Sequence, residues 1–406
     1  MIRALDVILH GQRIGQITLL PGENTLFSFE EEYITSSHRL TLSQSFMAMT
    51  GQIITQWRPI RTRIHPFFSN LLPEGHLRKY LALKNQISPQ REFDLIEALG
   101  EDLPGAVVIR SSTSDSQKRE TDVIFQDLPP EEGPFRFSLA GIQLKFSALI
   151  NRKRGMTIPA SGRGGTWILK LPSLNFPEVP ENEYAMLSLA KKVGIEVPEF
   201  RLIPLEEIEG LPSLGSFQGK LALAVKRFDR GPDHTRIHME DFAQVYGLFP
   251  EKKYEKVSYT NIANMVWTLC GEKGLTEYIR RLVFSILIGN GDMHLKNWSF
   301  LYPDGYNPVL SPAYDFLSTI PYIPGDNLAL TLSKERHMHL CDEALFKILL
   351  EKAKLPSHLV LNVVKETTDS TRQVWAQMKK EINLDQNIIS VINAHMESVP
   401  LGLLKK

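Results

Sequence analysis

The chain has 406 residues, of which 43% are hydrophobic, and 46 basic residues balance 46 acidic ones to a formal net charge of zero. Its length is too great for one compact core and predicts two or three structural units, and its hydrophobic content excludes a disordered chain. The zero net charge excludes a global electrostatic attraction to nucleic acid or acidic membranes, so any DNA contact would be local or made through a partner.

Cysteine usage and hydropathy indicate a cytoplasmic protein. Cys270 and Cys341 are too few and too isolated for a disulfide framework or a structural zinc site, as expected in a reducing compartment. Charged residues interrupt the apolar residues of the amino terminus, and the run from Leu282 to Gly289 is far short of a membrane span. We therefore expect a cytoplasmic localisation and no membrane partner.

The first 110 residues predict a mixed α/β domain. Residues 1–20 alternate apolar and polar side chains around a Gly11-Gln12 turn, and residues 58–83 contain helical signals punctuated by proline. The polar residues that follow predict a linker over 111–123. Beyond it we expect a small lobe over 124–230 and a helical lobe over 231–406, the latter with helices over 343–354 and 370–382.

A loop that could approach phosphate groups lies within residues 135–147. It reads Phe-Arg-Phe-Ser-Leu-Ala-Gly-Ile-Gln-Leu-Lys-Phe-Ser and contains a single glycine. It matches neither a Walker loop nor a Gly-x-Gly-x-x-Gly loop, and taken alone it would pass for a β-hairpin.

The next signal is a lysine within an apolar strand. Residues 166–172 have the composition of a strand, and Lys170 within it needs an anionic partner, because lysine is seldom buried unpaired. Glu183, Leu187 and Ala190 fall on one face of a helix predicted to begin at Glu183, so Glu183 can point inward. A strand lysine held by a helix glutamate is the ion pair that kinases use to reach nucleotide phosphates. The alternative is an edge-strand lysine with its ammonium group in solvent.

A second strand, predicted over residues 221–230, ends abruptly before Gly231-Pro232, as a hinge between two lobes would. Adenine offers one donor beside one acceptor, and backbone N–H and C=O groups at such a hinge commonly bind it. The side chains of Lys226 and Arg227 would then matter little. A plain hairpin strand explains the segment about equally well.

Residues 290–298 and 311–316 carry most of the chemical information. Asp292 and Asn297 are spaced as in the catalytic loop of protein kinases, where the aspartate orients the acceptor hydroxyl and the asparagine oxygen binds magnesium. Magnesium needs further hard oxygen ligands, and Asp315, at the end of an apolar stretch, is the natural candidate. The alternative is an ordinary Asn-Gly-Asp turn whose side chains bond their own backbone.

Two more residues of this loop are candidates. Lys296 could neutralise charge on the transferring phosphoryl group, although a solvated loop lysine is nearly as consistent with the sequence. No other histidine stands at metal-ligand spacing from His294, so we assign it a packing role or a place beside the nucleotide, and we assign no zinc.

The order of these motifs resembles that of the HipA family of bacterial toxin serine/threonine kinases. In the kinase portion the motifs are Ser-Leu-Ala-Gly-Ile-Gln-Leu-Lys, Ile-Leu-Lys-Leu-Pro, Glu-Asn-Glu-Tyr, Val-Lys-Arg-Phe-Asp-Arg, Gly-Asp-Met-His-Leu-Lys-Asn and Pro-Ala-Tyr-Asp. Asn-Leu-Leu-Pro-Glu-Gly at 70–75 and Ile-Glu-Ala-Leu-Gly-Glu-Asp-Leu-Pro-Gly-Ala at 96–106 resemble the amino-terminal domain of full-length members. The residues beyond 330 have helical character but match no motif.

The resemblance implies an α+β fold with a bilobal protein-kinase-like core, a mixed α/β amino-terminal domain and a helical carboxy-terminal lobe. It implies ATP and Mg²⁺ as cofactors, Asp292 and Lys296 as catalytic residues, Asn297 and Asp315 as metal ligands, and Glu183 as the partner of the nucleotide-binding lysine. The residues that would contact nucleotide are Ala140, Gly141, Ile142, Gln143, Leu144, Lys145, Lys170, Lys226, Arg227, Phe228, His294, Leu295, Lys296, Asn297, Tyr314 and Asp315.

The resemblance also implies the toxin of a type II toxin–antitoxin module, which phosphorylates a translation protein, typically an aminoacyl-tRNA synthetase. A HipB-like helix-turn-helix antitoxin would restrain the toxin and make most of the contact with DNA. Resembling members autophosphorylate a serine just before the Ala-Gly segment, so we expect self-inactivation at Ser138. Two alternatives are a small-molecule phosphotransferase of the aminoglycoside or choline kinase kind and a non-catalytic nucleotide-binding co-repressor.

Overall fold

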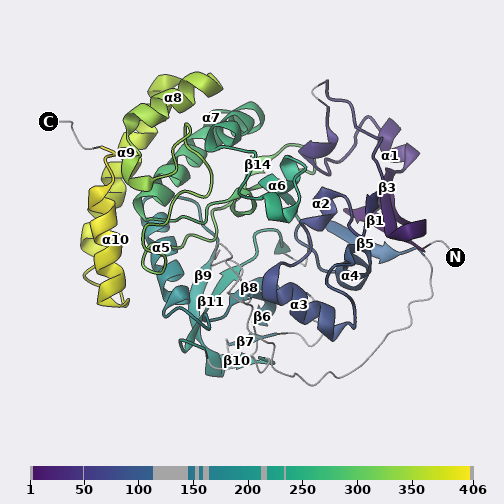
Figure 1. Ribbon diagram of the computed structural model, residues 1–406, viewed down its shortest axis with the longest axis horizontal. Coiled ribbons are helices and arrows are strands. Elements are labelled where there is room, and N and C mark those ends of the chain that lie inside the picture. Colours follow the sequence, from purple (N-terminus) through teal and green to yellow (C-terminus); the bar gives the residue numbers. More distant parts are fainter. Residues whose placement is uncertain are drawn as a thin grey trace.

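The computed structural model describes residues 3–48, 50–112, 145–150, 155–158, 164–211, 217–232 and 235–402. Figure 1 shows an amino-terminal domain on one side of the molecule, a small sheet near its lower centre and a helical lobe on the other side. Separate clusters of buried apolar side chains support these parts. Within these described ranges, no helix provides the uninterrupted apolar length that a membrane crossing requires.

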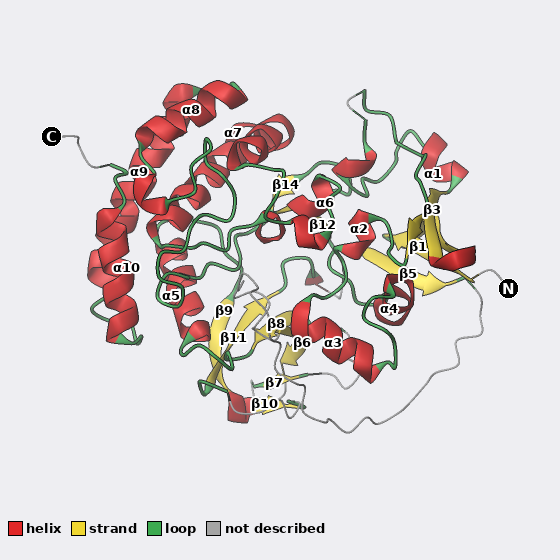
Figure 2. Ribbon diagram, in the orientation of Figure 1, coloured by secondary structure: helices red, strands yellow, loops and turns green. Residues whose placement is uncertain are grey.

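The amino-terminal domain is a five-stranded antiparallel sheet, in the order β4-β3-β2-β1-β5, with short helices beside it (Figure 2). Its strands are β1 (Arg3–Leu9), β2 (Gln12–Leu20), β3 (Asn24–Phe29), β4 (Ile60–Arg61) and β5 (Val107–Ser111). Its helices are α1 (Glu31–Thr35), α2 (Pro66–Ser69), α3 (Gly75–Lys84) and α4 (Glu92–Leu99).

Apolar and polar side chains alternate along the first strand of this sheet. Leu5, Val7 and Leu9 are all 0% exposed, and their spacing puts them on one face of β1. The chain then reverses at His10 and Gly11, whose φ angles of 48° and 81° suit the two central residues of a type I′ turn. The sequence pattern predicts this hairpin correctly but places its turn one residue too far along the chain.

The small lobe is a six-stranded sheet in the order β10-β7-β6-β8-β11-β9, and helix α5 (Val179–Lys192) packs against both β11 and the helical lobe. Its strands are β6 (Lys145–Ile150), β7 (Met156–Thr157), β8 (Trp167–Lys170), β9 (Phe200–Pro204), β10 (Ile208–Glu209) and β11 (Leu221–Lys226). The strand that contains Lys170 is therefore a central strand, which excludes the alternative of an edge-strand lysine.

Two boundaries in the small lobe differ from the sequence prediction. Helix α5 begins at Val179 and not at Glu183, because Pro180 is tolerated in the first helical turn, where backbone N–H groups need no helical partner. Strand β11 ends at Lys226 and not at Arg230, and a turn follows it.

The helical lobe opens with a three-stranded antiparallel sheet in the order β12-β13-β14. Its strands are β12 (His238–Asp241), β13 (Ser299–Tyr302) and β14 (Val309–Leu310), and its helices are α6 (Phe242–Val245), α7 (Tyr259–Leu287), α8 (Glu343–Ala353), α9 (Ser357–Met378) and α10 (Gln386–Ser398). Helix α7 starts at a capping box formed by Ser258 and Asn261. Its last turn is buried, and it leads the chain into the loop that contains Asp292.

The carboxy-terminal helices match the sequence pattern only in part. Helix α8 coincides with the predicted 343–354 to within one residue, but α9, predicted over 370–382, begins at Ser357. The first half of α9 buries β-branched residues such as Val360 and Val364, which have low helix propensity and conceal the helical pattern. Helix α10 lies at the outer edge of the lobe, and Nε2 of His395 in it donates to the carbonyl of Ile286 in α7 at 2.8 Å (Figure 1).

The amino-terminal domain contacts both lobes. Leu77 and Tyr80 of α3 pack against the core of the small lobe, where the ring of Tyr80 lies 6.0 Å from that of Phe146. Ser43 of the same domain donates its hydroxyl to Glu240 of β12 at 2.5 Å. One domain therefore holds the small lobe and the helical lobe together.

Candidate active site

Two lysines of the small-lobe sheet form the cationic part of the site. Strand β6 pairs with β8 so that Lys145 lies directly opposite Lys170. Side chains of directly opposite residues on paired strands project from the same face of the sheet. The two ammonium groups would therefore repel each other if nothing lay between them. Asp315 supplies the anion between them, because Lys145 Nζ lies 2.8 Å from its Oδ2 while Lys170 binds its Oδ1.

Lys170 has a second partner in α5. Its ammonium group donates to Oε1 of Glu183, and the two side chains are only 5% and 3% exposed. Burial lowers the pKa of Lys170, but the carboxylates of Asp315 and Glu183 outweigh burial and raise it above its ordinary value. The lysine–glutamate ion pair expected from the sequence is therefore present. We call Lys145, Lys170, Glu183 and Asp315 the lysine cluster.

Asp315 has a strained backbone. Its φ of 56° lies in the left-handed region, which residues with a side chain rarely adopt. Burial alone would raise the pKa of Asp315, but the charges of Lys145 and Lys170 outweigh it and hold the pKa well below the ordinary range. Strain of this kind persists where the surroundings over-determine it and is concentrated at functional sites.

Internal hydrogen bonds close the loop that carries Asp292. The side-chain oxygen of Asn290 accepts from the N–H of Asp292 at 3.0 Å, and the amide nitrogen of Asn297 donates to the carbonyl of Asp292 at 2.7 Å. Glycine is favoured at position 291, since a Cβ there would come within 2.8 Å of the backbone carbonyl oxygen of Asn327 as well as against the Asp326 carboxylate. The simple-turn interpretation thus holds for Asn290, whereas the carboxylate of Asp292 makes a longer-range contact.

That contact comes from a residue that the sequence analysis missed. Tyr254, in the turn between α6 and α7, donates its hydroxyl to Oδ1 of Asp292 at 2.6 Å across 38 positions of sequence. Burial raises the pKa of Asp292 to about 6, although the Tyr254 hydroxyl and the charge of Lys253 lower it. No periodicity or motif links positions so far apart, so the sequence contains no signal for Tyr254.

Lys296 is bonded across the domain boundary. Its Nζ lies 2.8 Å from Oε1 of Glu74, 3.0 Å from the carbonyl oxygen of Asn70 and 3.8 Å from Oδ2 of Asp241. Burial alone would raise the pKa of Glu74, but Lys296 and Lys253 outweigh it and lower that pKa far below its ordinary value. Lys296 is therefore not a solvated loop lysine, and its catalytic role stays a prediction.

His294 is buried beside Asp292 without a hydrogen bond. It is 2% exposed, and within the described part of the chain neither ring nitrogen has a partner. Burial lowers its pKa well below the ordinary value, so the ring is neutral. The ring meets that of Tyr254 edge-on at 4.9 Å. The contact accords with a packing role, while the unpartnered nitrogens leave room for a polar ligand.

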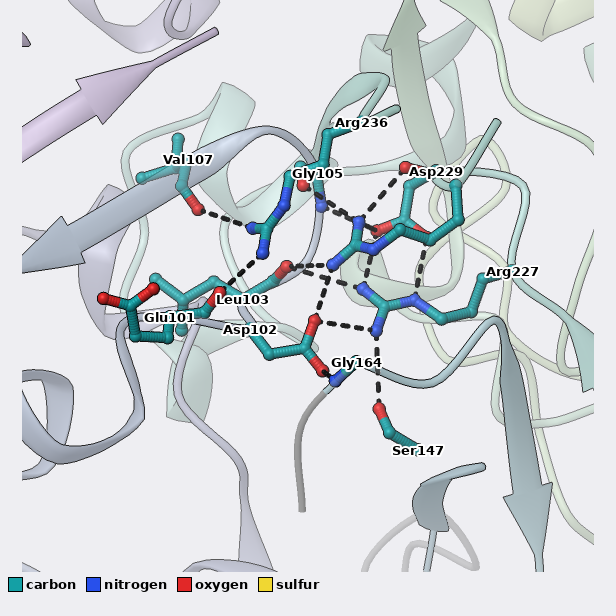
Figure 3. Close-up of polar contacts among 11 residues, drawn as sticks. Glu101, Asp102, Leu103, Gly105, Val107, Ser147, Gly164, Arg227, Asp229 and Arg236 are labelled. Atoms are coloured by element: carbon teal, nitrogen blue, oxygen red, sulfur yellow. Dashed lines mark hydrogen bonds and ion pairs between the residues drawn. The ribbon is translucent and has the colours of Figure 1, made fainter. Parts of the chain in front are cut away.

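Five charged residues meet beside the hinge expected after β11, and we call them the junction cluster. Arg227, Asp229 and Arg230 follow β11, Arg236 precedes β12, and Asp102 comes from the amino-terminal domain, between α4 and β5. Figure 3 labels Asp102, Arg227, Asp229 and Arg236 among their polar contacts. Arg227 donates to the two oxygens of Asp229 at 3.0 and 2.8 Å and to Asp102 at 3.3 Å. Arg230 bridges the same two carboxylates at 2.7 and 2.8 Å. The side chain of Arg227 thus ties the hinge to the amino-terminal domain. That it matters little for adenine binding stays a prediction.

The backbone near the hinge is partly used by the sheet. The N–H groups of Lys226 and Arg227 donate to the carbonyls of Glu199 and Thr166 at 2.8 and 2.9 Å. The side chain of Lys226 is 52% exposed and pairs with Glu199 at 3.2 Å. The N–H groups of Lys226 and Arg227 are therefore already bonded within the protein. The ring of the next residue, Phe228, lies 5.6 Å from that of Tyr314.

Part of the predicted site lies outside the described residues. This holds for Ser138 and for Ala140, Gly141, Ile142, Gln143 and Leu144, so Lys145 is the residue of that predicted nucleotide segment that the structure places.

Asn297 and Asp315 offer oxygen atoms of the kind that magnesium binds. The amide nitrogen of Asn297 is bonded to the Asp292 carbonyl, which leaves the amide oxygen as a potential ligand. Asp315 adds carboxylate oxygens that face two lysines. Mg²⁺ prefers hard oxygen donors of this kind and usually takes only one or two of them from the protein.

Comparison with known proteins points to one family. Residues 5–110 match the family model of the HipA N-terminal domain, and residues 137–375 match that of the HipA-like C-terminal domain. A protein of Sinorhizobium fredii named Y4dM is 46% identical over 98% of each chain. The serine/threonine-protein kinase toxin HipA of Shewanella oneidensis is 28% identical over 64% of each chain.

The fold is also found among solved structures. HipA in the Shewanella oneidensis complex of HipA, HipB and operator DNA matches with a TM-score of 0.74 at 22% identity, over 97% of this chain and 95% of that one. The α+β fold with a bilobal kinase-like core and an additional amino-terminal domain, expected from the sequence, is confirmed. The chain belongs to the HipA family and contains both its amino-terminal and its carboxy-terminal domain.

Proposed function

We propose that this chain is an ATP- and magnesium-dependent serine/threonine-protein kinase. The observation that carries the proposal is Lys170, which is buried on a central strand and bonded to both Glu183 and Asp315. Phosphotransfer requires a cation that can reach the nucleotide phosphates and, beside it, a carboxylate that can bind a metal ion.

Each residue of the site has a role in the proposed reaction. Asp292 orients the acceptor hydroxyl and accepts its proton, and a pKa of about 6 leaves its carboxylate mostly ionised at neutral pH. Asn297 and Asp315 hold Mg²⁺, which when bound neutralises charge that develops on the phosphates. Lys145 and Lys170 exchange part of their contact with Asp315 for contact with the phosphates.

The nucleotide contacts proposed are those assigned from the sequence. They are residues 140–145, Lys170, the hinge residues 226–228, the loop residues 294–297, and Tyr314 with Asp315. At the hinge only backbone contact is proposed, because the side chain of Arg227 belongs to the junction cluster. The unpartnered ring nitrogens of His294 support a polar ligand beside that residue.

Phosphopeptide mass spectrometry after brief expression of the wild type and of Asp292→Asn tests the activity and identifies the substrate. Phosphoserine or phosphothreonine sites that need Asp292 support a protein kinase. Phosphorylation of a small metabolite without new phosphopeptides would favour the small-molecule phosphotransferase. Nucleotide binding by the purified wild type without any turnover would favour the co-repressor.

We also propose that the chain is the toxin of a type II toxin–antitoxin module in the cytoplasm, with a HipB-like antitoxin as partner and an aminoacyl-tRNA synthetase as substrate. The family supports this, as does the similar solved structure, a HipA bound with HipB and operator DNA. Since the net charge is zero, DNA affinity should come mainly from a basic antitoxin and should depend on salt. Sequence-specific DNA retention by the purified chain alone would contradict this.

Self-inactivation at Ser138 is a further part of the proposal. A phosphate adds about two negative charges at neutral pH, and in a segment that approaches ATP phosphates it should repel them. Incubation with ATP and Mg²⁺ should place phosphate on Ser138 while substrate phosphorylation declines, and Ser138→Ala should stop the modification. Intact-mass analysis with peptide mapping checks this, and a phosphate on Ser147 alone would exclude it.

A further inference from the structure

Building on the proposed kinase activity, we propose that Tyr254 is a positioning residue for Asp292, and that Glu74 of the amino-terminal domain holds Tyr254 in place through the adjacent Lys253. The catalytic carboxylate would then be oriented by a chain of contacts that begins in a different domain.

The first contact is direct. The hydroxyl of Tyr254 donates to Oδ1 of Asp292 at 2.6 Å, and the Tyr254 ring packs edge-on against His294, which is itself buried. A carboxylate on a loop can rotate about its side-chain bonds. One fixed oxygen removes that freedom and leaves the second oxygen, Oδ2, to face an acceptor hydroxyl.

The second contact fixes the segment that carries Tyr254. The N–H of Leu295 donates to the carbonyl of Lys253 at 3.2 Å, and Arg336 donates to the carbonyl of Tyr254 at 3.3 Å. The turn at Lys253-Tyr254 is therefore bonded to the catalytic loop by its backbone as well as by the tyrosine hydroxyl.

The third contact crosses the domain boundary. The two carboxylate oxygens of Glu74 bind Lys253 and Lys296, each at 2.8 Å. Glu74 thus forms ion pairs at the same time with the turn that carries Tyr254 and with the loop that carries Asp292. Gly75, with a φ of 54°, lets the chain turn directly from Glu74 into α3, an angle that other residues adopt only with strain.

These contacts have the character of positioning. Tyr254 and Glu74 bond residues of the loop and its neighbouring turn, and neither takes part in a bond that breaks or forms. Loss of the Tyr254 hydroxyl should therefore lower kcat and leave the KM for ATP nearly unchanged, because the lysine cluster and the hinge are not altered. Loss of Glu74 should lower kcat as well, while its contact with Lys296 can also change the KM for ATP. A loss of stability alone would lower the amount of folded enzyme and not the kcat of the folded fraction.

Steady-state kinetics of full-length Tyr254→Phe tests the first contact, with Tyr246→Phe as the matched control. The hydroxyl of Tyr246 is buried and has no hydrogen-bond partner among the described residues, so its removal takes away no contact with the loop. We expect kcat of Tyr254→Phe to fall at least about tenfold, with KM for ATP within about twofold of the wild type, since small misplacements of a catalytic group cost this much. An unchanged kcat would overturn the proposal, and a raised kcat would show that Tyr254 blocks the acceptor site.

A double-mutant cycle of Glu74→Gln and Tyr254→Phe tests the path between domains. If Glu74 acts through Tyr254, the two losses in kcat should not multiply, because the second substitution disturbs a contact already lost. Glu251→Gln is the control, since it weakens an exposed ion pair with Arg63 across the same boundary and should leave kcat unchanged. Fully multiplicative losses would overturn the role of Glu74.

Turnover by the wild type separates this inference from the proposed function. A wild type that binds ATP without turnover would refute the kinase proposal and the positioning roles with it. An active wild type with a fully active Tyr254→Phe would refute only the positioning roles.

Discussion

The lysine cluster and the junction cluster contain similar charges in similarly buried surroundings, yet they are built differently. In the lysine cluster two lysines face Glu183 and Asp315. In the junction cluster Arg227 and Arg230 share Asp102 and Asp229. Composition alone would not show which of the two is a site.

The difference lies in how completely each group is satisfied within the protein. In the junction cluster, N–H groups of Gly105 and Gly164 also donate to the two carboxylates, at 2.8 and 2.9 Å, and the carbonyl of Leu103 accepts from Arg230 at 2.9 Å. Planar guanidinium groups fit such fixed acceptors well. The lysine cluster has point charges instead, and the side chain of Lys145 is 30% exposed. In the junction cluster the charged groups are fully hydrogen-bonded to one another and to the backbone, and the cluster holds domains together. In the lysine cluster the lysines can exchange their contact with Asp315 for contact with a ligand.

The largest effects should come from the carboxylates of the site. Asp292→Asn and Asp315→Asn should each reduce phosphotransfer by roughly 10²–10⁴-fold or more, but for different reasons. Losing Asp292 removes the group that orients and deprotonates the acceptor hydroxyl, so nucleotide still binds. Losing Asp315 removes a metal ligand, so Mg²⁺-dependent nucleotide affinity falls too. Calorimetric titration with and without Mg²⁺ distinguishes them, and equal affinities in both variants would contradict these roles.

A carboxylate of the junction cluster should affect stability instead. Asp102→Ala leaves Arg227 and Arg230 buried and short of an acceptor, which should lower the free energy of unfolding by about 3–5 kcal/mol. Glu101→Ala is the neighbouring control. Within the described ranges its side chain pairs with an exposed Arg110 alone, so the substitution should cost less than about 1 kcal/mol. Urea unfolding measures both. If the ATP affinity of folded Asp102→Ala also collapsed, the junction cluster would have to be counted as part of the site.

Glu240 is a buried carboxylate whose hydrogen-bond donors are neutral groups, and its pKa shows the effect of burial. Ser43, the N–H of Gln44 and Tyr302 donate to it, yet burial outweighs them and raises its pKa from 4.5 to about 7. A folded pKa above the unfolded one gives stability that is complete below pH 4.5 and is lost as pH rises to about 7. The shift corresponds to about 3 kcal/mol.

Glu240→Gln removes this titration. Between pH 5 and pH 8 the wild type should lose on the order of 2–3 kcal/mol relative to the variant, as measured by urea unfolding of both proteins at the two pH values. Parallel pH dependences would mean that Glu240 stays ionised, supported by its three donors.

Lys226 should give the smallest effect. Its side chain is exposed and pairs with an exposed Glu199, so Lys226→Ala should change the free energy of unfolding by less than about 1 kcal/mol. Nucleotide affinity should also stay nearly the same, since only backbone is proposed to bind adenine there. A large loss of affinity in calorimetric titration would show that the side chain reaches the nucleotide.

Relations within short segments were predictable from the sequence. The spacing of Asp292 and Asn297 on one loop follows from local geometry, and so does the inward face of Glu183 on its helix. Lys145 was assigned by resemblance, but only the register of β6 against β8 shows that it shares Asp315 with Lys170.

Relations between distant segments could not be predicted. The motifs at 96–106 and 225–230 were both recognised, yet neither indicates that Asp102 meets Arg227. The same holds for Tyr254 with Asp292 and for Glu74 with Lys296, because no period or spacing connects them. These contacts depend on how the domains pack, which only the folded chain determines.

The hydrogen bond from His395 to Ile286 can form only late in the synthesis of the chain, because His395 lies close to the carboxy terminus of the sequence. A ribosome releases the amino-terminal sheet early, so this domain can fold while the rest of the chain is still being made. The last turn of α7, which leads into the catalytic loop, gains this hydrogen bond from α10 only after residue 395 has emerged. The packing around the catalytic loop is therefore completed at the very end of synthesis, long after the amino-terminal domain has left the ribosome.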